Sequence, residues 1–195
     1  MITITEKEQL LMSEIISKGY RNAAVSFSKL TGQQVMIEVA HVELCSDHNY
    51  LLKKYNHQDN LTILQTEIIG QLSGVSYLIF NEKEKITISQ MSLASFGSNS
   101  TLDENIILLE IDNIISAAVI TELSNMLNLR IYGDVPALLK FDNMTDFHNS
   151  LKLEDEGHYV LTNSTFLFAN HKMISPIFLW KMDKRILEIV NDLDN

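Results

Sequence analysis

The sequence predicts an α+β protein in which two long helices pack on one face of an antiparallel or mixed β-sheet. Three observations predict this class. The chain resembles itself at a separation of about 96 residues, each half opens with a long stretch free of proline, and each half contains two β-rich runs joined by a short turn. Helices segregated from hairpins are typical of α+β layers. We therefore expect one domain, residues 1–195, made of two repeats at about 1–96 and 97–195.

The repeat is visible in residues that align between the halves. The segments Thr5–Glu8 and Thr101–Glu104 both fit a capping box, in which a threonine hydroxyl accepts from an early helical N–H and a glutamate bonds back to the cap. At the same separation, Glu14 aligns with Glu110. The small and polar residues 96–100 are the predicted linker.

Each repeat is expected to contain the same elements in the same order. The first comprises a helix at 6–31, a strand at 34–44, a short polar helix or loop at 47–55, strands at 61–70 and 75–80, and a helix at 82–93. The second comprises a helix at 102–128, a strand at 130–139, a short polar stretch at 144–151, strands at 159–169 and 174–181, and a helix at 183–193. Tetrapeptides of turn-compatible residues join the two strand pairs, which predicts hairpins.

Composition narrows the function before any motif is considered. The formal net charge is −10, with 15 Lys and Arg against 25 Asp and Glu, which disfavours nucleic acid and anionic membranes as partners. A single cysteine, Cys45, suits a reducing compartment, and neither a signal-peptide pattern nor an apolar run of membrane-spanning length is present. The expected location is therefore the cytoplasm. Cys45 and the six histidines lack paired metal-ligand spacing, so no metal site is predicted.

The second long helix carries the candidate functional residues. Stepping 100° per residue places Glu110 and Asn113 together on its outward face, because residues three apart are neighbours on a helix. The predicted core face comprises Leu108, Ile115, Val119, Leu123, Met126 and Leu127. The wheel places Asp112 on this core side. Either Asp112 is hydrogen-bonded at an edge between two helices, or the wheel is off by one step. Polar residues on an exposed helix face are also compatible with simple solvation.

The spacing of Glu110 and Asn113 to a proline distinguishes them. Glu-x-x-Asn occurs three times in the chain, but only after Asn113 do 22 residues lead to a proline, Pro136. This pattern resembles the CheC/CheX/FliY phosphatases of bacterial chemotaxis, whose signature is Glu-x-x-Asn, 22 residues and Pro in each active half. The resemblance implies the CheC-like fold, with Glu110 and Asn113 as catalytic residues and Pro136 as a supporting part of the motif.

The first half departs from the signature. Glu14 is present, but Ser17 stands at the Asn position and Ala40 at the Pro position. We expect this first site to be degenerate, either inactive or much weakened. Asp112 also departs from the family, which usually has a small residue there.

The resemblance implies hydrolysis of the aspartyl phosphate of a CheY-type response regulator in chemotaxis or two-component signalling. Asn113 would orient the attacking water, because an amide both accepts and donates hydrogen bonds without titrating. Glu110 would pair with a lysine of the regulator. The phosphatase would need no cofactor of its own, since Mg²⁺ is expected on the regulator.

One other function fits the same sequence, and a third fits it less well because it requires a module for which the sequence leaves no residues. A catalytically silent CheC-like protein would use the outward helix face to bind a receiver domain or a CheD-like partner. A flagellar-switch component would be expected to carry an additional sheet-forming module. A homodimer through sheet edges also remains open.

Overall fold

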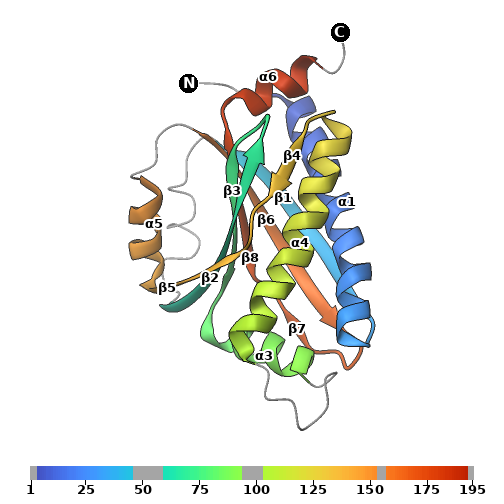
Figure 1. Ribbon diagram of the computed structural model, residues 1–195, viewed down its shortest axis with the longest axis vertical. Coiled ribbons are helices and arrows are strands. Elements are labelled where there is room, and N and C mark those ends of the chain that lie inside the picture. The colour runs from blue at the N-terminus through green and yellow to red at the C-terminus, as the bar shows by residue number, and fades with distance from the viewer. Residues whose placement is uncertain (1–3, 46–58, 94–102, 153–156, 193–195) are drawn as a thin grey trace.

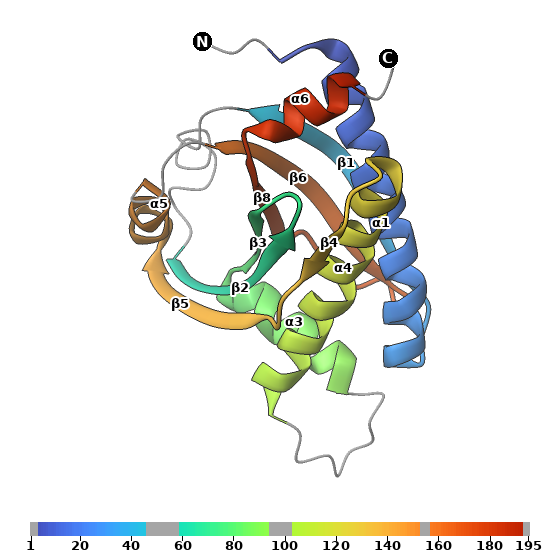
Figure 2. The same ribbon diagram turned by 45° about the horizontal axis from the view of Figure 1, so that its top comes forward.

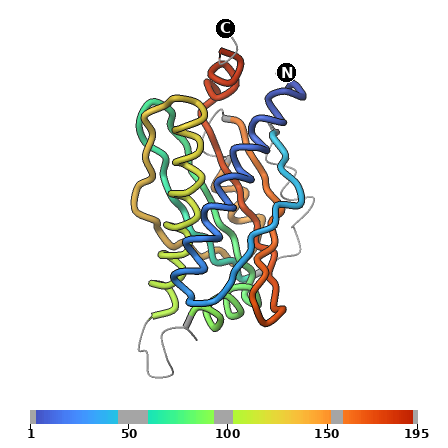
Figure 3. Tube along the Cα trace, turned by 90° about the vertical axis from the view of Figure 1, so that its right-hand side faces the viewer, coloured from blue at the N-terminus to red at the C-terminus, as the bar shows by residue number. Residues whose placement is uncertain are grey.

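The computed structural model describes residues 4–45, 59–93, 103–152 and 157–192. Two long helices, α1 and α4, lie side by side on one face of a curled antiparallel sheet (Figures 1 and 3), as the predicted α+β class requires. The elements in chain order are α1 (Glu6–Thr31), β1 (Val35–Cys45), β2 (Asp59–Gly70), β3 (Gly74–Phe80), α3 (Glu82–Leu93), α4 (Glu104–Met126), β4 (Ile131–Gly133), β5 (Ala137–Asn143), α5 (Met144–Lys152), β6 (Gly157–Phe168), β7 (Met173–Ile174), β8 (Ile177–Asp183) and α6 (Arg185–Asp192).

The strand order of the sheet is symmetrical about its centre. The order is β1-β6-β8-β3-β2-β4, with β5 also on β2 and β7 on β6, and every pair is antiparallel. The hairpins β2–β3 and β6–β8 meet at the β3–β8 pair, while β1 lies on β6 and β4 and β5 lie on β2. The opening strand of each predicted repeat therefore pairs with the hairpin of the other, although the division into repeats itself stays a prediction.

Apolar side chains alternate between the two faces of the sheet, as the two-residue period of a strand requires. On the helix side they pack under α1 and α4 in the larger core, which includes Ile15, Phe27, Ile115, Phe166 and Trp180. The opposite face is covered by α5 (Figure 2), in a smaller core of Leu61, Ile63, Tyr77, Ile79, Met144, Phe147, Leu151, Tyr159, Leu161, Ile177 and Leu179.

The two long helices begin differently. The capping box predicted at α1 is present: Thr5 Oγ1 accepts from the backbone N–H of Glu8, whose carboxylate accepts from the N–H of Thr5. The N-cap of α4 is Asp103, whose side chain accepts from the N–H of Asn105. The prediction of Thr101 as that cap was wrong, because the nearer Asp103 supplies the acceptor.

Two predicted strands are interrupted at prolines. The strand expected at 130–139 is divided into β4 and β5, and the one expected at 174–181 into β7 and β8. Pro136 and Pro176 lie in these interruptions, where a residue without an N–H cannot donate to the sheet. The polar stretch at 144–151 is the helix α5, whereas the stretch predicted at 47–55 lies outside the described residues.

Candidate functional site

The helix α4 presents Glu110 and Asn113 to the outside, as the helical wheel predicted. Both side chains are exposed. The predicted core residues Leu108, Ile115, Val119, Leu123 and Leu127 are buried, and Met126 is half-buried. Burial of this opposite stripe against α1 and the sheet fixes the rotation of α4 about its axis, and so the direction of its outward face.

The interruption between β4 and β5 lies next to these two residues. The N–H of Asp134 donates to the carbonyl of Glu67 on β2 (2.9 Å), and Asp134 Oδ1 accepts from the N–H of Val135 (2.7 Å). These bonds and the rigid ring of Pro136 fix the interruption on β2, beside the first half of α4. The two segments enclose a depression of about 390 Å³, lined by Ile106, Leu109, Glu110, Asn113, Gly133, Asp134, Val135 and Pro136.

The structure therefore brings Glu110, Asn113 and Pro136 to one place. Two exposed apolar side chains flank them: Ile106 is 57% exposed and Val135 is 82% exposed. Asp134 adds a second carboxylate to the depression, a residue that the sequence analysis did not single out. Its signal in the sequence was its place two residues before Pro136, within the 22-residue interval of the motif.

The side chains of Glu110 and Asn113 form no hydrogen bond or ion pair with any other residue in the described part of the chain. The other two Glu-x-x-Asn pairs differ. Glu122 is buried, accepts from Asn22 (2.7 Å) and pairs with Lys18 (2.7 Å), which links α4 to α1. The amide of Asn191 donates to Glu8 (2.9 Å). Only the first pair thus keeps both its functional groups free for an external ligand.

A polar seam lies beneath the site. Asp112 is buried between α4 and β2, and its Oδ2 accepts a hydrogen bond of 2.7 Å from Thr66 Oγ1. Burial raises the pKa of Asp112 from its ordinary value of 3.8 to about 7, and the bond from Thr66 opposes this only in part. The wheel had placed Asp112 correctly, and its partner belongs to the sheet rather than to a second helix.

A second depression adjoins Asn113 on the other side. It lies in the groove between α1 and α4, has a volume of about 400 Å³, and is lined by Asn22, Ser26, Asn113, Ile114, Ala117, Ala118 and Thr121. The small side chains of this groove leave the amide of Asn113 accessible from two directions.

The first-half counterparts do not form an equivalent site. Glu14 is exposed and lines a depression near the start of α1 with Leu10 and Val190 of α6, but Ser17 and Ala40 do not line it. Ser17 is half-buried, and Ala40 lies at an irregularity of β1, between Val39 and His41, across which the strand continues.

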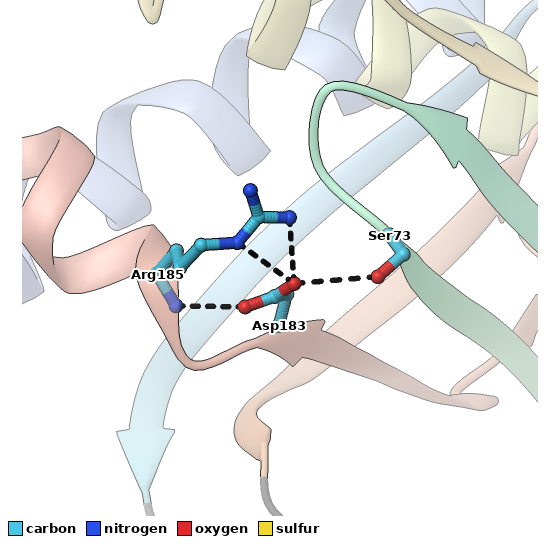
Figure 4. Close-up of polar contacts among 3 residues, drawn as sticks. All are labelled: Ser73, Asp183 and Arg185. Atoms are coloured by element: carbon cyan, nitrogen blue, oxygen red, sulfur yellow. Dashed lines mark hydrogen bonds and ion pairs between the residues drawn. The ribbon is translucent and has the colours of Figure 1, made fainter.

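The helix α6 closes this first region and is anchored at its start by Asp183. Asp183 Oδ1 accepts from the N–H of Arg185, while Oδ2 accepts from the Arg185 guanidinium and from Ser73 Oγ (Figure 4). The hydrogen bonds from Arg185 lower the pKa of Asp183. The carboxylate therefore acts as a helix cap, a structural role that leaves it no part in the candidate site.

The described residues contain no cluster of three or more His, Cys, Asp and Glu side chains that would hold a metal ion. None of the helices in the described ranges is long and apolar enough to cross a membrane.

Comparison with known proteins finds relatives at the level of the fold. No family model matches the chain, and no curated protein matches it. Among solved structures, the chain is similar to FliY of Thermotoga maritima, with a TM-score of 0.75 and 18% identity over 98% of this chain and 99% of that one.

Two further solved structures share the fold. One is the chemotaxis protein CheX of Desulfovibrio desulfuricans, with a TM-score of 0.57 and 13% identity over 87% of this chain and 99% of that one. The other is FliM from a FliG–FliM complex of H. pylori, with a TM-score of 0.60 and 14% identity over 96% and 100%. The chain therefore has the fold of the CheC, CheX and FliY proteins, as its sequence motif predicted.

Proposed function

We propose that the chain is a phosphatase that hydrolyses the aspartyl phosphate of a CheY-type response regulator in chemotaxis or two-component signalling. The observation that carries the proposal is the pairing of Glu110 and Asn113 on the outward face of α4. Both side chains are exposed, without partners among the described residues, and next to the interruption at Pro136. A helix face with a free carboxylate and a free amide fits entry into the acceptor site of another protein.

The roles of the two side chains follow from their chemistry. Phosphoryl transfer needs an attacking water in line with the leaving group and charge stabilisation around the transferred group. The carboxamide of Asn113 can accept from and donate to that water without changing its own charge. The carboxylate of Glu110 pairs with a lysine of the regulator and sets the register of α4 in the regulator's site.

The positive charge that stabilises the transferred phosphoryl group would come from the partner. The depression holds two carboxylates, Glu110 and Asp134, and no cation, which makes it unsuited to binding a free phosphate. Mg²⁺ would therefore be bound by the regulator, where it would offset part of the negative charge of the phosphoryl group. The chain itself supplies an orienting amide and a docking carboxylate.

The test is phosphate release from a CheY-type regulator charged with acetyl phosphate in the presence of Mg²⁺. We expect the wild-type protein to accelerate the release, and Asn113→Ala to lower this acceleration about 100-fold, the scale for a misplaced reactant. Ser17→Ala is the matched control and should leave the rate unchanged. An Asn113→Ala protein as fast as wild type would refute the assignment, and equal losses from both variants would show that the first site is active.

A second candidate function is a catalytically silent protein that binds a receiver domain or a CheD-like partner through the same helix face. It is favoured by the degenerate first region and by the similarity to FliM, a protein crystallised in complex with FliG. The two functions differ in one measurement. A silent protein would bind the charged regulator without accelerating phosphate release, whereas the proposed phosphatase does both.

A further inference from the structure

One buried side chain contacts both segments that border the candidate site. Thr66 of β2 donates its hydroxyl proton to Asp112, the residue that precedes Asn113 on α4. Its Cγ2 methyl faces β4, since a Cβ atom placed on Gly133 would lie 3.3 Å from it. A single threonine thus connects the helix that carries the amide with the strand that leads to Pro136.

The backbone around Thr66 holds the same two segments. The carbonyl of Glu67 accepts from the N–H of Asp134 (2.9 Å), and Gln65 pairs with Ala137 at the start of β5. Residues 65–67 of β2 therefore bond to both ends of the interruption. Only Thr66 reaches α4 from this segment by a side-chain hydrogen bond in the described part of the chain.

We propose that Thr66 is a positioning residue, which sets the separation between Asn113 and the β4–β5 interruption by holding Asp112 and packing against Gly133. The proposal rests on the proposed function for its effect on catalysis. Asn113 lies on a helix that makes no other side-chain hydrogen bond to the sheet among the described residues, and apolar packing by itself is non-directional. A short hydrogen bond in the buried seam supplies direction, and its loss would leave the Asp112 carboxyl buried without its donor.

The other half connects its helix to the sheet through a different pair, the buried hydroxyls of Tyr20 on α1 and Thr162 on β6, which lie 2.9 Å apart. The residue 96 positions before Asp112 is Ile16, which is buried. Ser164 of β6, which pairs with Val39 of β1 beside the Ala40 irregularity, is buried with no hydrogen-bond partner for its hydroxyl in the described residues. The first region, which lacks the Asn and Pro of the motif, therefore has a buried hydrogen bond between helix and sheet but no buried carboxyl group at the place of Asp112.

The test compares Thr66→Val, which keeps the shape of the side chain and removes the donor, with Thr66→Ser, which keeps the donor. Thr62→Val is the matched control, because Thr62 is buried on the same face of β2, four residues earlier, and bonds to no residue of α4 among those described. Phosphate release from the charged regulator is measured at varied regulator concentration.

We expect Thr66→Val to lower kcat about ten-fold while KM changes less than about two-fold, because a misplaced amide impairs chemistry more than docking. Thr66→Ser should recover most of the wild-type rate, and Thr62→Val should retain it. Wild-type kcat in Thr66→Val, or an equal loss in Thr62→Val, would overturn the proposal.

A second measurement tests whether Thr66 positions α4 relative to β4, and it does not require an activity assay. Spin labels at Ala117→Cys and Tyr132→Cys, both exposed positions on α4 and β4, report the separation of the two segments by pulsed electron resonance in a Cys45→Ser background. A shifted or broadened distance distribution in Thr66→Val, but not in Thr62→Val, supports the proposal. An unchanged distribution in Thr66→Val overturns the proposal. This outcome can be read even if the wild-type protein releases no phosphate and the proposed function has failed.

Discussion

The region around Glu110 and the region around Glu14 share helix placement but differ in the strand beside the helix. Beside α4, the chain leaves the sheet at Gly133 and re-enters it at Ala137, and the interruption borders the depression at Glu110. Beside α1, the strand β1 runs unbroken for 11 residues and passes its irregularity at Ala40. A glutamate on an outward helix face is therefore not enough for a site, since the neighbouring backbone must also open toward it.

The layers beneath the two helices differ in the same sense. The α4 side buries a carboxyl group, Asp112, with a hydroxyl donor. The α1 side buries Ile16 at the corresponding place and bonds to the sheet through the neutral hydroxyls of Tyr20 and Thr162. Burying a polar pair gives less stability than burying an aliphatic side chain, but it adds direction to the packing. The α4 region therefore differs from the α1 region in burying a titratable group next to the candidate site.

The largest expected effect concerns Asp112 and pH. Because folding raises its pKa from 3.8 to about 7, the folded chain binds this proton more tightly than the unfolded chain does. The free energy of unfolding should then fall as pH rises from about 4 to about 7 and level off above that.

The substitution Asp112→Asn removes this titration and keeps an acceptor for Thr66. The difference in unfolding free energy between the variant and wild type should increase in favour of the variant by up to roughly 4 kcal/mol from pH 4 to pH 8, at 1.36 kcal/mol per pKa unit. Urea unfolding at both pH values measures it, with the exposed Asp142→Asn as a control that should gain little. If the variant differs from wild type by the same unfolding free energy at both pH values, the buried carboxyl of Asp112 does not titrate as expected.

Exchanging the residues of the two regions tests whether the contrast is chemical or geometric. Asn113→Ser places the first region's residue on α4 and should lower phosphate release about 100-fold, because a serine hydroxyl is too short to reach the same water. Ser17→Asn should produce no second activity in that Asn113→Ser background, since Ser17 shares no depression with Ala40. Recovery of activity in the double variant would show that the first region is competent in geometry.

Gly133→Ala tests the close packing of β4 against α4. The added Cβ would lie 3.0 Å from Ile120 Cδ1 and 3.3 Å from Thr66 Cγ2. We expect a loss of about 1–3 kcal/mol in unfolding free energy from overpacking, together with slower phosphate release. Thermal unfolding and the release assay measure both effects, and a variant as stable and as active as wild type would contradict the close packing.

The smallest expected effect is the difference in stability between the N-terminal caps of α1 and α4. Thr5→Ala removes a reciprocal capping box and should lower the unfolding free energy by about 1 kcal/mol, whereas Asp103→Ala removes a single bond at an exposed cap and should lower it by about 0.5 kcal/mol. Chemical denaturation of the two variants compares them directly. Equal losses would show that the carboxylate of Glu8 adds nothing to the cap of α1.

Much of this architecture could be predicted from local patterns. The bounds of α1 and α3 match the expected helices at 6–31 and 82–93, because period, caps and the absence of proline act within a few turns of chain. The outward face of α4 could be predicted from the rotation of 100° per residue in an α-helix. The interruption at Pro136 was missed, although the motif contained it, because β-rich residues on both sides favour a continuous strand and only pairing with β2 shows where the backbone leaves the sheet.

The sequence by itself determined the α+β class, the helix face that carries Glu110 and Asn113, and their spacing to Pro136. These depend on periodicities and intervals, which are properties of the chain alone. Only the tertiary structure decided that Asp134 joins them, that Glu122 and Asn191 are engaged elsewhere, and that Thr66 is the partner of Asp112. The hydrogen bonds among these contacts join residues 46 to 183 positions apart in the chain, and the packing of helices on a sheet selects which distant groups meet.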